Sequence, residues 1–349
     1  MRILIITQKV DINDPILGFF HSWINKFAPH FEKVSVICLE KGEINLPNNV
    51  KVYSLGKEAG KSKLKYVSRF FRYILGLARE YDTVFVHMNQ EYMLMGGWFW
   101  RLTRKKIIFW RNHPKGNLLT RVASHLANTV LCTSKFAFVA RYKKTQLMPV
   151  GIDTHIFGSQ NSNKRERDRG RILSIGRVSP IKNIDLMIET IRILHDRKVS
   201  CKFDIVGSPV NPEDSDYRDK LVRDAQDLVE SGVINFLPAV PHHETPELYA
   251  QHEVFLNLTP TGSLDKTIFE AAVSGTIPVV TNLSLQGEID PRLIVREASP
   301  QLIANCVELI LDLKEDEKDA LRKKLASNVL EHQSNNALTT KLVKILQNG

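Results

Sequence analysis

The sequence predicts an α/β protein with two doubly wound domains, each a parallel sheet with helices on both faces. Short apolar runs rich in β-branched residues alternate with helical patterns, which is typical of βαβ units. The alternation stops at a polar, charged segment over 159–170 and then restarts. A chain of 349 residues that is 43% hydrophobic and 25% charged is long enough for two domains of ordinary size.

The first half contains six strand patterns. We expect these strands at 2–7, 34–39, 50–54, 83–87, 107–110 and 129–133. A loop over 8–18 leads into a helix at 19–27, and 61–80 has the pattern of a basic amphipathic helix. These elements predict an N-terminal domain over 1–150.

The second half repeats the pattern after a linker over 151–170. We expect strands at 171–175, 202–206, 234–237, 255–258 and 277–281, and helices at 183–197, 216–231, 246–251 and 265–274. They predict a second domain over 171–330. A helix near 337–346 has its apolar residues on one face, so the segment 331–349 is expected to pack back on the N-terminal domain.

Charge is divided unevenly along the chain. Residues 1–150 contain 24 Lys and Arg against 9 Asp and Glu, whereas the remainder contains 24 against 29. Residues 101–150 contain no carboxylate at all. A basic half indicates an anionic partner. We do not expect nucleic acid to be that partner, because the half has no RNP-like, zinc-finger or helix-turn-helix pattern.

The remaining composition suggests a cytoplasmic protein. No apolar run approaches the length of a membrane span, and the N-terminus reads as a first strand and not as a signal peptide. The four cysteines are far apart and lack CxxC spacing, so we expect reduced thiols that fill the core: Cys38, Cys132, Cys201 and Cys306.

The helix expected at 265–274 has the features of a phosphate-binding N-terminus. Asp265 is a suitable N-cap, and Gly275 suits the position just after the helix. The loop before it, 259–263, is small and polar, so unpaired backbone N–H groups and the positive end of the helix dipole face a ligand. Glu270, about one turn inside, could accept hydrogen bonds from a ribose.

A second loop supplies cations. Arg177 leaves the strand at 171–175, and Lys182 opens the next helix. In open α/β sheets ligands bind at the carboxyl ends of the strands, so these two side chains can flank a diphosphate. Neither GxGxxG nor GxxxxGK[ST] is present in these loops, which argues against a dehydrogenase or a P-loop NTPase.

Four ordered motifs resemble the retaining glycosyltransferases of family 4, which have the GT-B fold. They are PVGIDTHIF, GRVSPIKN, VPHHETPELYAQHEVFLNLTPTG and LDKTIFEAAVSGTIPVV. The likeness covers most of 130–290. It implies transfer of a sugar from a UDP-, GDP- or ADP-sugar to a hydroxyl of a glycan or lipid-linked acceptor, with the anomeric configuration kept.

The resemblance also implies roles for individual residues. Arg177 and Lys182 would stabilise the leaving diphosphate, Glu270 would bind the donor ribose, and His113 matches the active-site histidine. Fixed cations and helix N–H groups can replace a metal, so no metal or cofactor is expected. The triplet 214–216, Asp-Ser-Asp, is attributed to solvated charge at a helix N-terminus.

The sugar-binding part of the site departs from the family. Gly262 occupies the position of a second glutamate; Asp265 could reach the sugar instead, or could only cap its helix. The departure leaves open a catalytically silent nucleotide-sugar binding protein, or an epimerase of the same fold. The expected nucleotide-sugar contacts are Gly18, Gly176, Val240, Pro241, Gly262, Ser263, Leu264, Asp265, Lys266 and Thr267.

The N-terminal domain supplies candidates on the acceptor side. Asp11 is placed to orient a hydroxyl, and His21 and His87 are further candidates, although each also fits a structural role. His113 has the same alternative, as a hydrogen-bonded histidine at a turn before proline.

The basic helix at 61–80 has two interpretations. Its apolar face could lie in the core with a solvated basic rim. Alternatively, together with the cations at 101–106, it could attach the protein to an anionic membrane surface, which would make it peripheral at the inner membrane face.

Overall fold

The structure is a computed structural model that describes residues 1–60, 62–158, 168–262 and 264–347. Contacts divide the chain into two compact units. The first comprises Met1–Gly151, Gly262–Leu264 and Asn335–Gly349, and the second comprises Ile152–Thr261 and Asp265–Ser334. Residues 159–167 of the linker predicted over 151–170 lie outside the described residues.

The first unit is built on a seven-stranded parallel sheet in the order β3-β2-β1-β4-β5-β6-β7. The strands are β1 (Arg2–Val10), β2 (Lys33–Lys41), β3 (Val50–Ser54), β4 (Thr83–His87), β5 (Lys106–Trp110), β6 (Thr129–Cys132) and β7 (Thr145–Leu147). The chain runs outward from β1 in one direction and then, from β4, in the other, so the topological switch point lies between β1 and β4.

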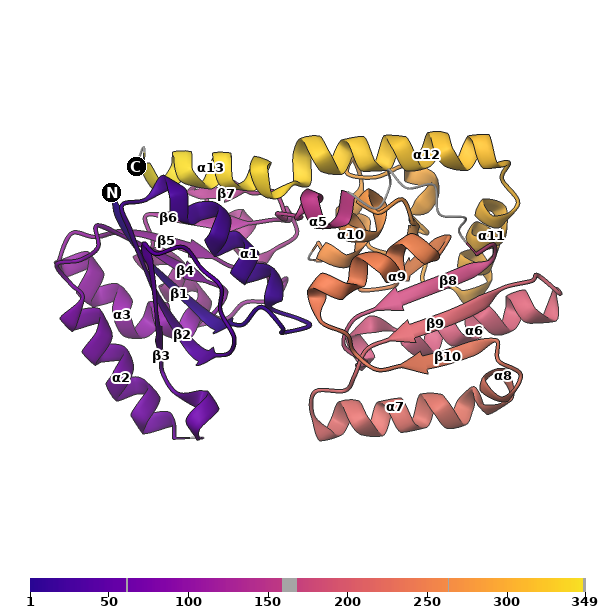
Figure 1. Cartoon of the computed structure of the whole chain (residues 1–349), viewed down its shortest axis with the longest axis horizontal. Coiled ribbons are helices and arrows are strands. Elements are labelled where there is room, and N and C mark those ends of the chain that lie inside the picture. The colour runs from indigo at the N-terminus through magenta and orange to yellow at the C-terminus, as the bar shows by residue number, and fades with distance from the viewer. Residues whose placement is uncertain (61, 159–167, 263, 348–349) are drawn as a thin grey trace. The chain divides into compact units, whose positions relative to one another are not determined.

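Helices cover both faces of this sheet (Figure 1). They are α1 (Gly18–Phe27), α2 (Lys63–Gly76), α3 (Gln90–Leu102), α4 (Leu118–Leu126) and α13 (Asn335–Gln347). One face buries Phe70 of α2 and Trp100 of α3. The other buries Trp23 of α1 with Leu338 and Leu342 of α13. The terminal helix therefore packs on the first sheet, as the sequence predicts.

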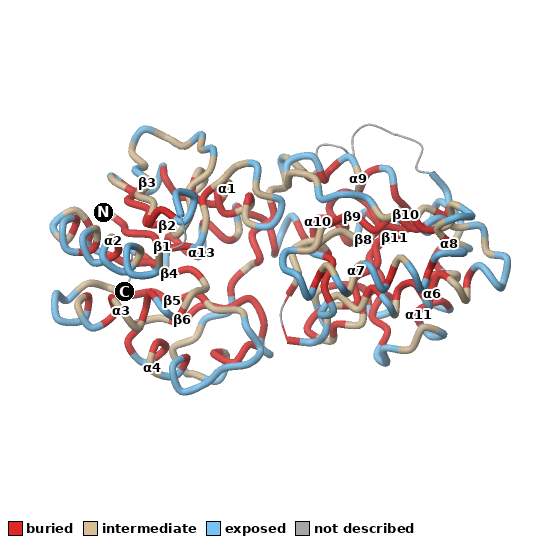
Figure 2. The backbone as a smooth tube through the Cα atoms, turned by 90° about the horizontal axis from the view of Figure 1, so that it is seen from below, coloured by how far each residue is buried: buried red, intermediate tan, exposed pale blue. Residues whose placement is uncertain are grey.

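The second unit contains a five-stranded parallel sheet in the order β10-β9-β8-β11-β12. Its strands are β8 (Arg171–Ile175), β9 (Lys202–Val206), β10 (Ile234–Leu237), β11 (Val254–Asn257) and β12 (Ile277–Val280). Its helices are α5 (Thr154–Gly158), α6 (Ile184–Asp196), α7 (Pro212–Asp224), α8 (Gln226–Glu230), α9 (Thr245–Gln251), α10 (Lys266–Val273), α11 (Pro300–Leu311) and α12 (Glu315–Asn328). Most of the strand residues are buried (Figure 2).

Several elements escaped the sequence pattern. α3 has apolar residues all round its circumference and two glycines in its centre, so it lacks the one-sided stripe of a surface helix. α7 begins at Pro212, four residues earlier than expected, because Asn211 caps it by accepting a hydrogen bond from the Asp214 N–H at 2.8 Å. β7, α4 and α11 were also not predicted.

The apolar face of α2 divides between core and solvent. Phe70 and Ile74 are fully buried. Four other apolar side chains, spaced three or four residues apart, are exposed: Leu64 (85%), Val67 (40%), Phe71 (38%) and Leu75 (54%). The interpretation in which the apolar face lies in the core therefore holds for only part of that face. Over the described residues no helix is both long and apolar enough to cross a bilayer.

Candidate functional site

Two glycines bring the loops after β8 and β9 together at the carboxyl edge of the second sheet. The Gly176 N–H donates to the Val206 carbonyl at 3.0 Å, and the Gly207 N–H donates to the Leu237 carbonyl at 3.0 Å. A Cβ atom at Gly207 would lie 1.8 Å from the Gly176 carbonyl oxygen, so no side chain fits there. Gly176 is one of the nucleotide-sugar contacts expected from the sequence, whereas Gly207 is not.

Arg177 follows this crossing and points toward the start of α7. Its Nε donates to Ser179 Oγ at 3.2 Å and lies 3.7 Å from Asp214 Oδ2. Asp214 is buried, at 4% exposure, so attributing it to solvated helix charge is wrong. The side chain of Arg177 is 42% exposed. Within the described part of the chain its hydrogen bond and its ion pair both involve Nε, and the terminal nitrogens have no such partner. Those nitrogens are placed to bind an anion.

Lys182 and Asp265 join the loop after β8 to the N-terminus of α10. Lys182 Nζ lies 2.5 Å from Asp265 Oδ2. The same carboxylate accepts hydrogen bonds from Asn257 Nδ2 at 3.0 Å and from Thr267 Oγ1 at 2.9 Å, and it caps α10 through the Thr267 N–H. Asp265 is therefore the N-cap that the sequence predicts and also the partner of Lys182.

Electrostatics keep Asp265 ionised. Burial by itself raises the pKa of Asp265, but the Lys182 ammonium and the hydrogen bonds from Lys182, Asn257 and Thr267 outweigh it and lower the pKa to about 2. The edge between β8 and α10 thus holds a formed ion pair at neutral pH. Arg177 contributes a further positive charge on the same loop.

Glu270 is buried one turn into α10. Its side chain accepts a hydrogen bond from the Tyr249 hydroxyl at 3.3 Å and lies 2.9 Å from His242 Nε2. Burial, followed by the negative charge of Glu270, raises the pKa of Tyr249, so the phenol stays protonated and donates. A carboxylate has about four acceptor positions, which leaves capacity for ligand hydroxyls. Phe157 packs edge-on against both the His242 and Tyr249 rings.

The other nucleotide-sugar candidates lie around this edge. Val240 lines an open groove of about 660 Å³ along α9, and Pro241 follows it. Lys266 is the first residue of α10 and is partly buried. Gly262 has φ +146° and Leu264 is buried; both fall in the segment that groups with the first unit. Ser263 lies outside the described residues.

His113 follows β5 in the first unit and is exposed. Its Nδ1 lies 3.0 Å from the Lys115 nitrogen and 2.8 Å from the Lys115 carbonyl oxygen, so the tautomer decides whether the ring accepts or donates. Both contacts use the same ring nitrogen. Among the described residues Nε2 has no hydrogen-bond partner.

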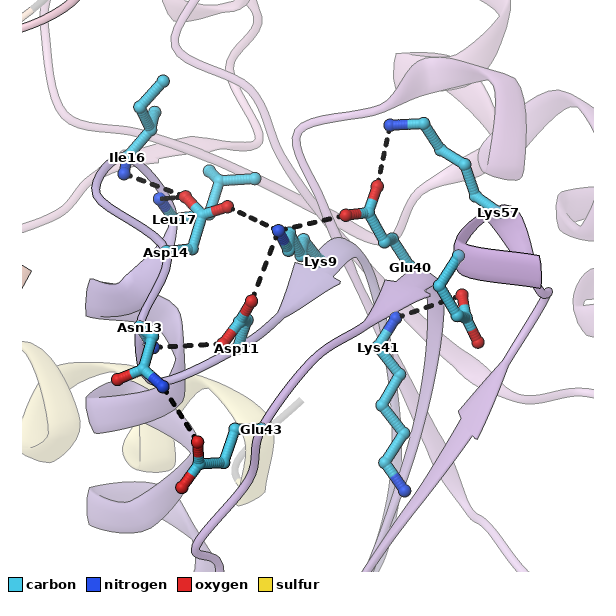
Figure 3. A network of polar contacts seen from close by, with 11 residues as sticks. Lys9, Asp11, Asn13, Asp14, Ile16, Leu17, Glu40, Lys41, Glu43 and Lys57 are labelled. Carbon is cyan, nitrogen blue, oxygen red and sulfur yellow. Dashed lines mark hydrogen bonds and ion pairs between the residues drawn. The ribbon is translucent and has the colours of Figure 1, made fainter. Parts of the chain in front are cut away.

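Asp11 belongs to a network of charges beyond the carboxyl ends of β1 and β2 (Figure 3). Lys9 Nζ lies 3.3 Å from Asp11, 2.8 Å from Asp14 and 3.0 Å from Glu40. Gly42 packs so closely that a Cβ there would lie 2.2 Å from the Asp11 carboxyl carbon. Gly18 opens α1 nearby in the sequence, and its N–H donates to the Asp14 carbonyl at 3.0 Å.

The two remaining histidine candidates for the acceptor side, His21 and His87, are buried in the first unit. His21 Nε2 accepts from the Asn45 N–H at 3.0 Å, and burial lowers the pKa of this histidine. His87 stacks on Phe20 with ring centroids 4.3 Å apart and has Thr7 Oγ1 at 3.4 Å. These surroundings match the structural alternative for both residues.

Several residues of the site carry no strong sequence signal. His242, Tyr249 and Asn257 contact Glu270 or Asp265 only because the sheet brings their loops together. The HHE of the third motif was the one available hint of His242. Within the described ranges no group of three or more His, Cys, Asp or Glu side chains is arranged to hold a metal ion.

A comparison with family models matches residues 158–330 to "Glycosyl transferases group 1". This region contains Arg177, Lys182, Asp265 and Glu270. No curated protein sequence matches the chain.

Solved structures match the whole chain. Anabaena Alr3699/HepE in complex with UDP aligns with a TM-score of 0.78 at 16% identity, covering all of both chains. Sucrose-phosphate synthase from Thermosynechococcus elongatus aligns with a TM-score of 0.78 at 15% identity, over 100% of this chain and 99% of that one. A UDP-forming α,α-trehalose-phosphate synthase from Burkholderia xenovorans, in complex with glucose-6-phosphate, aligns with a TM-score of 0.76 at 11% identity, over 99% and 100%.

Together these likenesses confirm the predicted fold class, and the family model agrees with the predicted resemblance to glycosyltransferases. At sequence identities of 11–16% the structural matches establish the fold alone. The family model concerns residues 158–330, which lie in the second unit except for Gly262–Leu264. Residues 158–330 of this chain match the model of the group 1 glycosyl transferases, and the chain carries them on a GT-B fold.

Proposed function

We propose that this protein is a retaining glycosyltransferase that moves a sugar from a nucleoside diphosphate to a hydroxyl of a glycan or lipid-linked acceptor. The observation that carries the proposal is the ion pair between Lys182 and Asp265, which holds a cation beside the first turn of α10. A diphosphate bound there meets Arg177, Lys182 and the positive end of the α10 helix dipole.

These groups act on the leaving diphosphate. During transfer the bond between the anomeric carbon and the phosphate oxygen breaks, so negative charge grows on the diphosphate. Arg177 and Lys182 lower the energy of that charge more in the transition state than in the bound substrate, which is the condition for catalysis. We therefore propose transfer without a metal ion, and a chelator should leave turnover unchanged.

Glu270 would bind the donor ribose. The carboxylate is already fixed by Tyr249 and His242, so it needs no reorientation when the ribose hydroxyls arrive. The base would lie against the backbone near Val240 and Pro241. Because two of the structural neighbours were solved with UDP or UDP-glucose, a UDP-sugar is the first donor to test.

The first unit would supply the acceptor side through His113, Asp11 and Gly18.

We further propose that the protein attaches to an anionic membrane surface from the cytoplasmic side. The support is the exposed apolar stripe of α2, Leu64, Val67, Phe71 and Leu75, which is flanked in the sequence by Lys63, Lys65 and Arg72.

A thermal-shift screen tests the donor site. UDP, GDP, ADP and the corresponding nucleotide sugars should be compared, since a ligand that binds only the folded state raises the melting midpoint. We expect one base to raise it and its nucleotide sugar to be slowly hydrolysed without acceptor. No shift with any nucleotide would overturn the proposal, and binding without hydrolysis or transfer would identify a silent binding protein.

A further inference from the structure

The first unit has a second polar pocket, away from the residues discussed so far. It is lined by Arg121, Ser124 and His125 of α4 and by Arg141, Tyr142 and Lys144, which precede β7, and its volume is about 240 Å³. The last turn of α4 leads into β6 and Lys144 leads into β7, so the pocket lies at the amino edge of the sheet. The acceptor-side candidates Asp11 and His113 follow the carboxyl ends of their strands, at the opposite edge.

The charge of this pocket is uncompensated. Residues 101–150 contain no carboxylate. Across the described part of the chain, no ion pair joins Arg121, Arg141 or Lys144 to an acidic group. Burial, followed by the positive charge of Arg101, lowers the pKa of Lys144. The positive charge of Arg101 therefore also acts on the pocket.

The donors of the pocket are fixed but only partly used. Lys144 Nζ donates to the His125 carbonyl at 3.1 Å and to the Ala127 carbonyl at 2.7 Å, which leaves one of its three N–H groups. Arg141 Nε donates to the Phe138 carbonyl at 2.8 Å, and its guanidinium lies 3.9 Å from the centre of the Phe138 ring. This contact holds the guanidinium plane and leaves the terminal nitrogens available.

Tyr142 provides an independent sign of a missing partner. Its hydroxyl oxygen is shielded from solvent yet has no hydrogen-bond partner among the described residues, although Tyr142 lines the pocket. A buried hydroxyl without a partner costs about 1–3 kcal/mol, so such groups are normally satisfied. An acceptor-rich ligand in the pocket would satisfy it once the atoms that now cover the hydroxyl move aside.

We propose that this pocket binds a phosphate group, held by Arg121, Arg141, Lys144 and the Tyr142 hydroxyl. Phosphate offers several acceptor oxygens and up to two negative charges, which match planar guanidinium donors, an ammonium and a phenol. The group can belong to a soluble phosphate or to the headgroup of a membrane lipid. The inference does not depend on the donor site in the second unit.

Titration calorimetry with inorganic phosphate on the full chain tests the soluble source. Arg121→Gln should weaken phosphate binding about tenfold and Tyr142→Phe about threefold, the usual range for charged and neutral hydrogen bonds. Arg121 is exposed and the Tyr142 hydroxyl has no partner, so both variants should keep the wild-type melting midpoint. Lys220→Gln, an exposed cation on α7 of the second unit, is the matched control and should bind as wild type.

Flotation with phosphatidylcholine vesicles, with and without phosphatidic acid, tests the lipid source. If the ligand is a headgroup, phosphatidic acid should recruit the wild type and the Lys220→Gln control, and recruitment should fall in Arg121→Gln and Tyr142→Phe. If the ligand is soluble, only the calorimetric affinities should fall in those variants. Unchanged affinity for both probes in both variants would overturn the proposal.

Discussion

The ammonium of Lys182 lies 2.5 Å from Asp265 Oδ2, and this ion pair ties the loop after β8 to the first turn of α10. The same carboxylate caps the helix. One residue thus holds a cation and a helix N-terminus, the two groups that we propose for the diphosphate. The sequence left open whether Asp265 only caps α10, and the ion pair shows that it does more.

Replacing Asp265 with asparagine separates its two tasks. Asparagine caps helices as well as aspartate does, so α10 should remain formed. Removing the negative charge frees Lys182, and we expect nucleoside diphosphate to bind at least as tightly. Turnover should fall about tenfold or more, because Lys182 loses its fixed position. Binding measured by calorimetry should therefore be kept or become tighter while kcat falls; a parallel loss of both would contradict this role.

Lys182→Ala should remove most of the transfer activity. Loss of one group that stabilises transition-state charge typically lowers kcat about 100-fold or more. Circular dichroism should show an intact fold, and Lys220→Ala should behave as wild type.

Glu270→Ala should lose transfer activity to a similar extent. Glu270→Gln should preserve stability better than Glu270→Ala because it keeps an acceptor for Tyr249. Near wild-type turnover in both Lys182→Ala and Glu270→Ala would show that the site is wrongly assigned.

Asp204 on β9 should make the second unit sensitive to acid. Burial alone would raise the pKa of Asp204, but hydrogen bonds from His252 and Asn235 and the charge of Arg171 lower it to about 2, from 3.8. A carboxyl with a lowered folded-state pKa stabilises above its unfolded pKa and loses that effect as the pH falls through its folded pKa. About 2.5 kcal/mol of the free energy of unfolding should therefore disappear as the pH falls from about 5 to about 1, most of it between pH 4 and pH 2.

Denaturant unfolding followed across that pH range measures the effect. Asp204→Asn should be less stable at neutral pH and should show a flatter dependence between pH 4 and pH 2. Asp216→Asn, at an exposed position of α7, is the control that should follow the wild-type curve. An unchanged slope in Asp204→Asn would rule out this assignment.

The exposed stripe of α2 should bind anionic vesicles. Replacing Leu64 and Leu75 with serine should abolish co-sedimentation with phosphatidylglycerol vesicles at low salt while the melting midpoint stays within about 2 °C, because both side chains are already exposed. Leu330→Ser, an equally exposed leucine of the second unit, should still bind. Wild-type protein that stays in the supernatant would remove the membrane proposal.

Gly207→Ala should destabilise the second unit by about 1–3 kcal/mol, because the added methyl group would overlap the Gly176 carbonyl. Gly232→Ala is the comparison, since a Cβ there meets open space and only its φ of +70° is unfavourable, at about 1–2 kcal/mol. Equal stability of Gly207→Ala and wild type, by denaturant unfolding, would show that the loops after β8 and β9 can separate.

The sequence by itself determined most of the strands, several of the helices and the local chemistry of residues that are close together in the chain. Periodicity located the strands of the second sheet because buried parallel strands are short apolar runs, and it placed Arg177, Lys182 and Glu270 at strand ends and in a helix. It also identified Asp265 as a cap, since a cap contacts N–H groups only two or three residues away.

Only the tertiary structure decided which distant residues meet. Lys182 and Asp265, or Glu270 with His242 and Tyr249, become neighbours because parallel strands place their carboxyl ends at one edge of the sheet. The division of α2 into buried Phe70 and exposed Leu64 depends on which neighbours cover it. The pocket lined by Arg121, Arg141, Lys144 and Tyr142 also depends on the tertiary structure, because local sequence patterns carry no information on contacts between separate elements.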